Sequence, residues 1–220
     1  MEKPNTIYIC GSGGTACEVY GILKILNLQA YVKGFVVGNE YPVNGKMLFS
    51  VPVMHEENIK GESSVRIVAI GTPGKKSWIQ KMEKDGAHFL SVIHPSSIAL
   101  ENIRYGEGVI IYPGVVMTTN ITVGDFTIIN AGATIGHDSK IGSYCHVAPG
   151  VHIAGNVTVG DESWIGIGAS ISMRVNIGSH VMIGAGAVVV SDIPDNTLAY
   201  GVPAKVVRSI TEGDWKDLLS

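Results

Sequence analysis

His137 and Asp138 are adjacent in the sequence, and their side chains make them the pair in this chain best suited to move a proton. A neutral imidazole accepts a proton near neutral pH. A neighbouring carboxylate can orient the ring, fix its tautomer and stabilise the imidazolium that forms. The pair therefore predicts a general base, His137 with Asp138 as its partner. Acyl transfer from a thioester to an amine or hydroxyl needs such a base, because the acceptor must lose a proton.

Two more polar residues, Asn130 and His146, lie close to this pair in the sequence. We expect them to gather with His137 and Asp138 at polar corners of a repeat. The alternative is that all four are solvated turn residues, since corners accept many polar side chains. Cys145 is expected to be buried in the core, and His152 and His180 to be surface residues without a catalytic role.

The element that must position these residues is a six-residue repeat. Ile or Val occupies every sixth position twelve times in succession: Val123, Ile129, Ile135, Ile141, Val147, Ile153, Val159, Ile165, Ile171, Ile177, Ile183 and Val189. A period of six is neither helical nor a simple alternation, so it predicts a parallel β-helix with one short strand and one turn per hexad. With three strands per coil, side chains at equivalent positions of successive coils then stack in a continuous apolar core.

The repeat can be followed backward from Val123 to Ile93 with weaker residues, and Pro194 interrupts it. We therefore expect the β-helix domain to span residues 93–194. Residues 195–220 are expected to form a C-terminal cap, from the turn Gly201–Lys205 and a short helix around Gly213–Leu219.

Residues 1–92 have a different pattern. Apolar strands are expected at 6–10, 31–37, 65–70 and 89–93, with helices after Gly14 and after Gly74 and turn-rich sequence from Asn44 to Pro52. Strands that alternate with helices predict a small parallel α/β sheet of the Rossmann kind.

A glycine-rich turn, Gly11-Ser12-Gly13-Gly14, joins the first strand of this domain to its first helix. Glycines at such a place let backbone N–H groups approach a phosphate, and the helix dipole favours its negative charge. The turn alone is a weak signal, because similar turns occur in proteins that bind nothing there.

Composition excludes several classes. The net charge is -3 and Lys and Arg are not clustered, which argues against nucleic acid and membrane surfaces as partners. No apolar run is long enough for a membrane helix, and the N-terminus does not resemble a signal peptide, so we expect a cytoplasmic protein. Three cysteines without a CxxC pair fit reduced thiols.

Three segments together resemble a known family: the GSGG turn, the stretch NAGATIGHDSKIGSYCHVAPGVHIAGNVTVG and the C-terminal GVPAKVV. They are similar to the sugar acetyltransferases of the NeuD/PglD type, over almost the whole chain. The resemblance implies a left-handed β-helix and a homotrimer that binds acetyl-CoA between subunits. It also implies N-acetylation of a nucleotide-linked, UDP-type amino sugar by direct transfer, with no metal.

The resemblance also implies roles for individual residues. His137 would be the base, Asp138 its partner and Asn130 a polar residue of the active site. The cofactor would be bound by His146 at its thioester end and by Gly155, Ile167, Ala185 and Lys205. The N-terminal domain would hold the nucleotide sugar, through Gly11, Ser12, Gly13, Gly14, Thr15 and Gly71.

This chain departs from the family pattern in its N-terminal domain. Thr15 stands where His is usual, and Val36-Val37 replace an acidic pair at the end of the second strand. The sugar substrate would then differ from that of the family or be bound in another way. Glu40 and Lys75 are only weak substitutes for the missing acidic pair. O-acetylation of a sugar such as a sialic acid therefore stays an alternative.

Three other functions remain open at this point. A zinc carbonic-anhydrase-like solenoid would need three converging His, and the six-residue spacing of His146 and His152 disfavours it. A nucleotide dehydrogenase would need a larger first domain. A trimeric binding protein without activity would keep the fold but fail to bind acetyl-CoA.

Overall fold

The computed structural model describes residues 6–59, 64–72, 74–211 and 215. The chain forms two compact units, which are described separately. One comprises Met1–Gly71 with Lys75–Val92, and the other Thr72–Gly74 with Ile93–Ser220.

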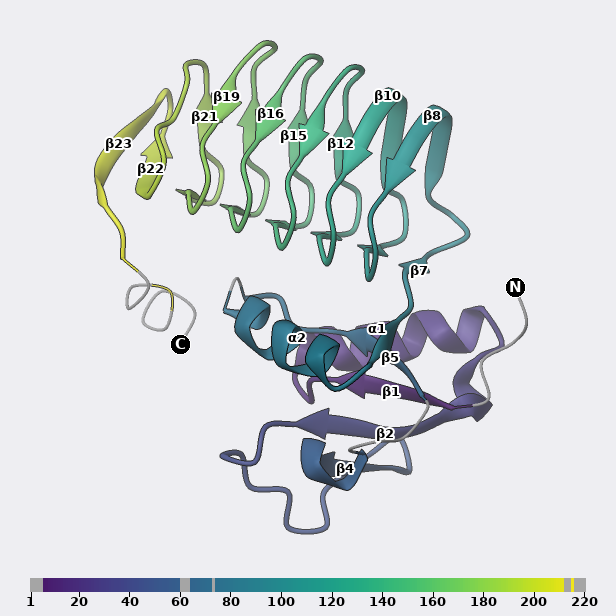
Figure 1. Ribbon diagram of the computed structural model, residues 1–220. Helices are drawn as coiled ribbons and strands as arrows, with labels where there is room; N and C mark the ends of the chain where they lie inside the picture. The colour runs from purple at the N-terminus through teal and green to yellow at the C-terminus, as the bar shows by residue number, and fades with distance from the viewer. Residues whose placement is uncertain (1–5, 60–63, 73, 212–214, 216–220) are drawn as a thin grey trace. The chain divides into compact units, whose positions relative to one another are not determined.

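The N-terminal unit is an α/β structure built on one six-stranded sheet (Figure 1). The strand order is β3-β4-β2-β1-β5-β6, for β1 (Ile7–Cys10), β2 (Val32–Val37), β3 (Met47–Leu48), β4 (Val51–His55), β5 (Val65–Val68) and β6 (His88–Phe89). Every adjacent pair is parallel except β3 and β4. The described α-helices are α1 (Gly14–Ile25) and α2 (Lys75–Lys84), and the short 3-10 helices are η1 (Gln29–Tyr31) and η2 (Glu56–Ile59).

Two details of this sheet differ from the sequence prediction. Val51–His55, which contains Pro52 and follows a turn-rich stretch, forms strand β4 rather than a loop. The stretch 89–93 is not one strand, because its two ends pair in different sheets: β6 pairs with β5, and β7 (Val92–Ile93) belongs to the solenoid. Leu90-Ser91 separate the two short strands, and the boundary between the two units follows directly, between Val92 and Ile93.

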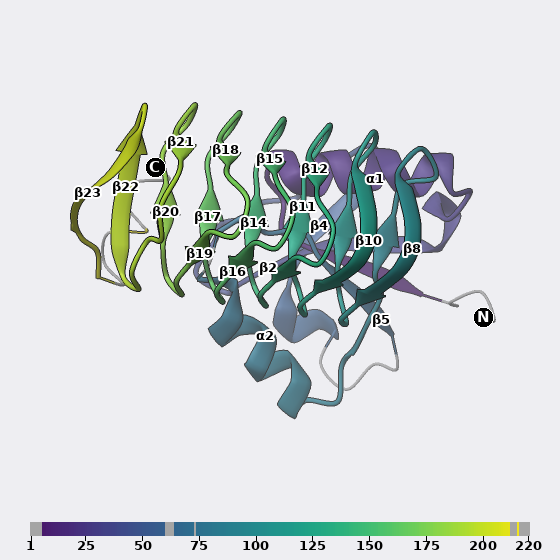
Figure 2. The ribbon, with the colours of Figure 1, turned by 90° about the horizontal axis from the view of Figure 1, so that it is seen from above.

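The second unit is a parallel β-solenoid, as the hexads predict (Figures 1 and 2). Partner strands lie three hexads apart in the sequence, for example Ile135 beside Ile153 and Ile153 beside Ile171. Each coil therefore has three faces joined by three corner turns. Viewed from above, the strands of successive coils lie in rows (Figure 2).

We name the faces by their strands. Face 1 holds β12 (Thr134–Ile135), β15 (His152–Ile153), β18 (Ser170–Ile171) and β21 (Val188–Val189). Face 2 holds β13 (Lys140–Ile141), β16 (Thr158–Val159) and β19 (Asn176–Ile177). Face 3 holds β7, β9 (Ile110–Ile111), β11 (Ile128–Ile129), β14 (His146–Val147), β17 (Trp164–Ile165) and β20 (Met182–Ile183). The longer strands β8 (Ile98–Tyr105) and β10 (Val116–Val123) run through a corner and join faces 1 and 2 into one sheet.

The repeat positions from Val123 to Val189 are all buried, which confirms them as the core. The backward extension is weaker than predicted. Met117 and Ile111 are buried, but Ile93 and Ala99 are exposed. These two residues belong to the first coil, which has a neighbouring coil on one side only.

The C-terminal end is closed by an antiparallel hairpin of β22 (Thr197–Gly201) and β23 (Ala204–Ser209), with the expected turn between them. The register changes before it: Ile177 pairs with Ile193 rather than with Asp195, which stands three full hexads further on. The expected helix around 213–219 lies outside the described residues except for Trp215, which is buried against Met182 and Ile210.

Candidate active site

His137 and Asp138 occupy the corner turn between β12 on face 1 and β13 on face 2. We call this row of turns corner A. Asp138 has a positive φ of 58°, a conformation that Asp and Asn accept more readily than most residues. The same turn position has positive φ in the neighbouring coils, at Asn120 and Asn156. The turn geometry is thus repeated from coil to coil, and the side chains placed on it differ.

The two side chains form the predicted pair. Nδ1 of His137 lies 2.8 Å from Oδ2 of Asp138, and both side chains are about half exposed, at 58% and 47%. Hydrogen bonds from His137 and then from Asn120 hold the pKa of Asp138 below its ordinary value. Asp138 is therefore an acceptor at neutral pH. Nδ1 of the neutral ring must donate to it, which leaves Nε2 with a lone pair open to a substrate.

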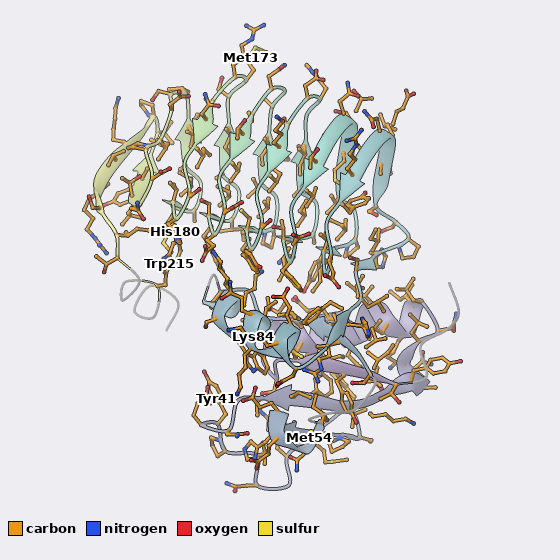
Figure 3. The ribbon with its side chains drawn as sticks, in the orientation of Figure 1. Tyr41, Met54, Lys84, Met173, His180 and Trp215 are labelled. Atoms are coloured by element: carbon orange, nitrogen blue, oxygen red, sulfur yellow. The ribbon has the colours of Figure 1, made fainter. Side chains whose placement is uncertain are left out.

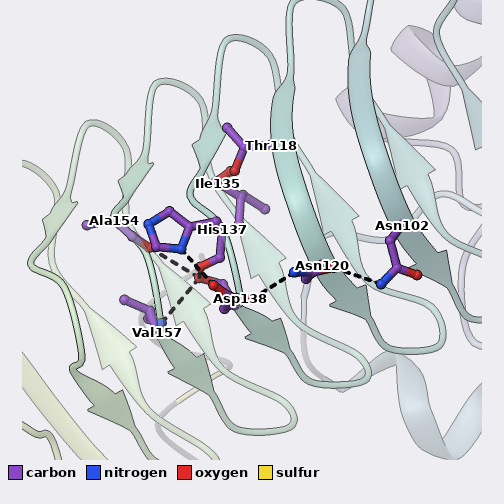
Figure 4. Close-up of polar contacts among 9 residues, drawn as sticks. Asn102, Thr118, Asn120, Ile135, His137, Asp138, Ala154 and Val157 are labelled. Atoms are coloured by element: carbon purple, nitrogen blue, oxygen red, sulfur yellow. Dashed lines mark hydrogen bonds and ion pairs between the residues drawn. The ribbon is translucent and has the colours of Figure 1, made fainter.

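Gly155 lies one coil further along corner A, under the ring of His137. A Cβ atom on Gly155 would lie 2.6 Å from Nε2 of His137, closer than such atoms approach. Ser139 fixes this turn from inside, since its hydroxyl donates to the carbonyl of Ala154 and accepts the N–H of Val157 (Figure 4). Because Gly155 has no side chain, the imidazole of His137 can pack directly against this turn.

Asn120 and Asn102 extend the site in a way that the sequence reasoning missed. Nδ2 of Asn102 donates to Oδ1 of Asn120 at 2.8 Å, and Nδ2 of Asn120 donates to Oδ1 of Asp138 at 3.0 Å (Figure 4). The signal was present in the sequence, because the three residues stand at the same position of successive coils.

Asn130, Ile167 and Ala185 lie on a different row of turns, between faces 3 and 1, which we call corner C. Ile167 and Ala185 are exposed, and Asn130 accepts the N–H of Ala131 at 2.8 Å. Within one chain these residues do not join His137, because one strand of face 1 separates the two corners. A hexad turns the chain by one corner, so Asn130 and His137 fall on successive corners.

His146 is not at a corner, contrary to expectation. It lies on β14 of face 3, is 5% exposed, and stacks on Trp164 with ring centroids 4.1 Å apart. Trp164 in turn packs against the group of Met182, Ile210 and Trp215. A cofactor contact of His146 stays a prediction. Lys205 is exposed on β23, at the capped end of the solenoid.

In the N-terminal unit, the glycine-rich turn joins the carboxyl end of β1 to the first residue of α1. Gly11 has φ of 121° and its Cα faces the carbonyl of Ala69, which follows β5. Gly13 and Gly14, by contrast, are exposed and face open space, so packing in this chain does not require glycine there. Ser12, Thr15 and Gly71 are partly exposed at the same carboxyl edge of the sheet.

The remaining sequence predictions concern residues outside this site. Cys145 is fully buried, as predicted, and His152 is exposed. Among the described residues, no three His, Cys, Asp or Glu side chains are grouped so that they could hold a metal ion. No helix in the described ranges is long and apolar enough to cross a membrane.

These features define a class, the hexapeptide-repeat transferases. The model of the bacterial transferase hexapeptide family (six repeats) matches residues 120–155, which include His137, Asp138 and Gly155. A search of curated protein sequences finds no significant match.

Solved structures give a closer comparison. A variant of perosamine N-acetyltransferase from Caulobacter crescentus, in complex with CoA and GDP-perosamine, is 33% identical with a TM-score of 0.85, over 93% of this chain and 97% of that chain. WeeI from Acinetobacter baumannii AYE is 26% identical with a TM-score of 0.85, over 92% and 99%. The acetyltransferase domain of PglB from Neisseria gonorrhoeae FA1090, in complex with acetyl coenzyme A, is 27% identical with a TM-score of 0.81, also over 92% and 99%. The chain belongs to the NeuD/PglD-type sugar acetyltransferase family of hexapeptide-repeat acyltransferases.

Proposed function

We propose that this protein transfers acetyl from acetyl-CoA to the amino group of a nucleotide-linked amino sugar, with His137 as general base. The observation that carries the proposal is the exposed His137–Asp138 pair over Gly155, at a corner of an acyltransferase solenoid. The Caulobacter neighbour, which binds CoA and GDP-perosamine, supports both substrate classes.

The chemistry follows from the ring geometry. Nε2 of His137 takes a proton from the acceptor amine as its nitrogen attacks the thioester carbonyl. The N–C bond forms, the C–S bond breaks, and the CoA thiolate receives the proton from the imidazolium. Asp138 stabilises that imidazolium through Nδ1–H and stays ionised. Transfer is direct, and no acyl-enzyme is formed.

The acetyl-CoA site is proposed to lie along corner A and to be completed by a second subunit. Gly155 leaves the turn next to His137 without a side chain. One coil further, the equivalent turn position carries Met173, which is 60% exposed and points away from the coil (Figure 3). In a homotrimer of left-handed solenoids, corner C of the next subunit, with Asn130, Ile167 and Ala185, would form the opposite wall. Lys205 and His146 remain proposed cofactor contacts.

The N-terminal unit is proposed to be a Rossmann-like domain that binds the nucleotide sugar. Gly13 and Gly14 support this, since their open surroundings at the first turn of α1 leave backbone N–H groups accessible to phosphate. Ser12, Thr15 and Gly71 would line the same edge, and Glu40 folds back onto Gly38 at the end of β2.

The test replaces the base and keeps everything else. We expect His137→Ala to fold and to bind acetyl-CoA but to lose roughly 100-fold or more in turnover, the usual contribution of a general base. His180→Ala is the matched control, because His180 also faces a carboxylate, Glu162, 3.5 Å away at another corner. Near wild-type turnover in His137→Ala would remove His137 from this role.

A panel of candidate substrates identifies the acceptor of the acetyl group. UDP-linked and GDP-linked amino sugars, and a hydroxyl acceptor such as a sialic acid, are each incubated with acetyl-CoA, and products are weighed and fragmented by mass spectrometry. N-acetylated nucleotide sugar supports the proposal. An O-acetylated product alone contradicts it, and so does a protein that binds acetyl-CoA but acetylates nothing.

A further inference from the structure

A hydrogen bond joins Asn120 to Asp138, the residue at the same turn position one coil further along corner A. Asp138 accepts from His137 through Oδ2 and from Asn120 through Oδ1, so both carboxylate oxygens are engaged and the group cannot rotate freely. The short Asp side chain, on a turn with positive φ, is thereby held by donors from two coils.

The hydrogen bonds from Asn102 to Asn120 and from Asn120 to Asp138 can run in only one donor-to-acceptor direction. An ionised carboxylate only accepts, so Asn120 must present its NH2 group to Asp138. Its carbonyl oxygen then faces Asn102, whose NH2 group donates to it at 2.8 Å. Asn102 thus selects the amide orientation of Asn120 that Asp138 needs.

We propose that Asn120, oriented by Asn102, is a positioning residue that acts through Asp138 to hold His137 as the Nδ1–H tautomer with Nε2 as the base. The expected effect on kcat rests on the proposed function, whereas the expected effect on the tautomer of His137 does not. Asn120 contacts the imidazole only through Asp138, so its effect must disappear when Asp138 is removed.

Two substitutions separate the hydrogen bond from the shape of the residue. Asn120→Gly removes the side chain and keeps a residue that accepts positive φ. Asn120→Asp keeps the shape but cannot donate, and it puts a second negative charge beside Asp138. Asn196→Gly is the matched control, since Asn196 has the same φ of 55° at a different corner.

We expect Asn120→Gly to lower kcat about 3- to 10-fold, with the KM for acetyl-CoA within about 2-fold of wild type. Asn120→Asp should lose as much or more, and Asn196→Gly should match wild type. The double variant Asn120→Gly with Asp138→Ala should equal Asp138→Ala alone. Wild-type kcat in Asn120→Asp, or additive losses in the double variant, would overturn the proposal.

A second measurement needs no sugar substrate. The 15N shifts of the His137 ring, assigned by their loss in His137→Ala, report its tautomer. We expect Nδ1–H in wild type and a mixture with Nε2–H in Asn120→Gly, whereas an unchanged tautomer contradicts the proposal. If no amino sugar is acetylated, the proposed function fails while this measurement still decides the role of Asn120.

Discussion

The imidazole of His137 lies over the Cα of Gly155, so close that a methyl group on Gly155 would be 2.6 Å from Nε2. The two residues occupy the same turn position in successive coils. The base is therefore placed by two neighbours, a carboxylate that holds its Nδ1 and a glycine that leaves room for the rest of the ring.

Gly155→Ala should displace the ring of His137 without unfolding the solenoid, because Gly155 does not have a positive φ and the obstacle is a movable side chain. We expect kcat to fall about 10-fold or more, since small misplacements of catalytic groups are costly. Steady-state kinetics and circular dichroism check this. Gly21→Ala, at an open position in α1, is the control and should keep full activity.

Mixed assemblies test the proposed homotrimer, in which corners A and C of different subunits would form one site. His137→Ala disables corner A, and Ala185→Trp is designed to block corner C. Each variant alone should be inactive. After denaturation and refolding of an equal mixture, roughly one quarter of the sites should carry both intact corners, the product of two halves in a ring of heterologous contacts. No recovered activity in trimers of mixed composition, verified by native mass spectrometry, would place the whole site within one chain.

The hexads predicted the solenoid correctly because a six-residue period fits neither a helix nor an alternating strand, and the Ile or Val of each hexad is buried in the core. The His137–Asp138 pair was predictable for a related reason, since two adjacent residues on one turn stay adjacent after folding. Both inferences needed only local sequence.

Predictions that depended on stacking were harder. Asn130 was predicted to lie near His137 because the two are close in the sequence. In the folded chain they lie at successive corners of one coil, on opposite sides of strand β12. Asn120 is far from Asp138 in the sequence, yet it contacts this residue because three hexads complete one coil. In the N-terminal unit, β4 was missed because Pro52 weakens a strand signal that pairing with β2 restores.

The three thiols should differ in reactivity. Burial raises the pKa of Cys10 to about 12, although the charge of Arg66 acts in the opposite direction, so the reactive thiolate is rare at pH 8. Cys145 is fully buried and its Sγ lies 3.1 Å from the carbonyl oxygen of Gly160. We expect iodoacetamide to label only Cys17 in the native protein and all three residues in urea, as located by peptide mass mapping. Rapid native labelling of Cys10 would contradict the burial.

Glu56 should make the N-terminal unit sensitive to acid. Burial raises its pKa, but hydrogen bonds from Lys81 and Trp78 of α2 outweigh this and hold the pKa below the ordinary value. A lowered pKa contributes stability above the unfolded-state pKa and loses it as the pH falls through the folded-state pKa. We expect Glu56→Gln to lower Tm by about 2–5 °C at pH 7. The difference should begin to shrink below about pH 4 and disappear once the pH is below the folded-state pKa of Glu56. Glu57→Gln, at the neighbouring exposed residue, should change Tm little at either pH.

Ser163 is expected to be a structural hydroxyl that ties two coils together. It is fully buried, donates to the carbonyl of Gly178 at 2.9 Å and accepts the N–H of Val181 at 3.1 Å. Ser163→Ala leaves both backbone groups buried without this partner, which typically costs about 1–3 kcal/mol. Urea unfolding should therefore show a lower midpoint with an unchanged slope. Ser170→Ala, at a half-buried strand position on face 1, should change the free energy of unfolding by less than about 0.5 kcal/mol. An effect of Ser163→Ala as small as that of Ser170→Ala would mean that water or a backbone shift replaces the Ser163 hydroxyl, and that this hydroxyl adds nothing to the stability of the coils.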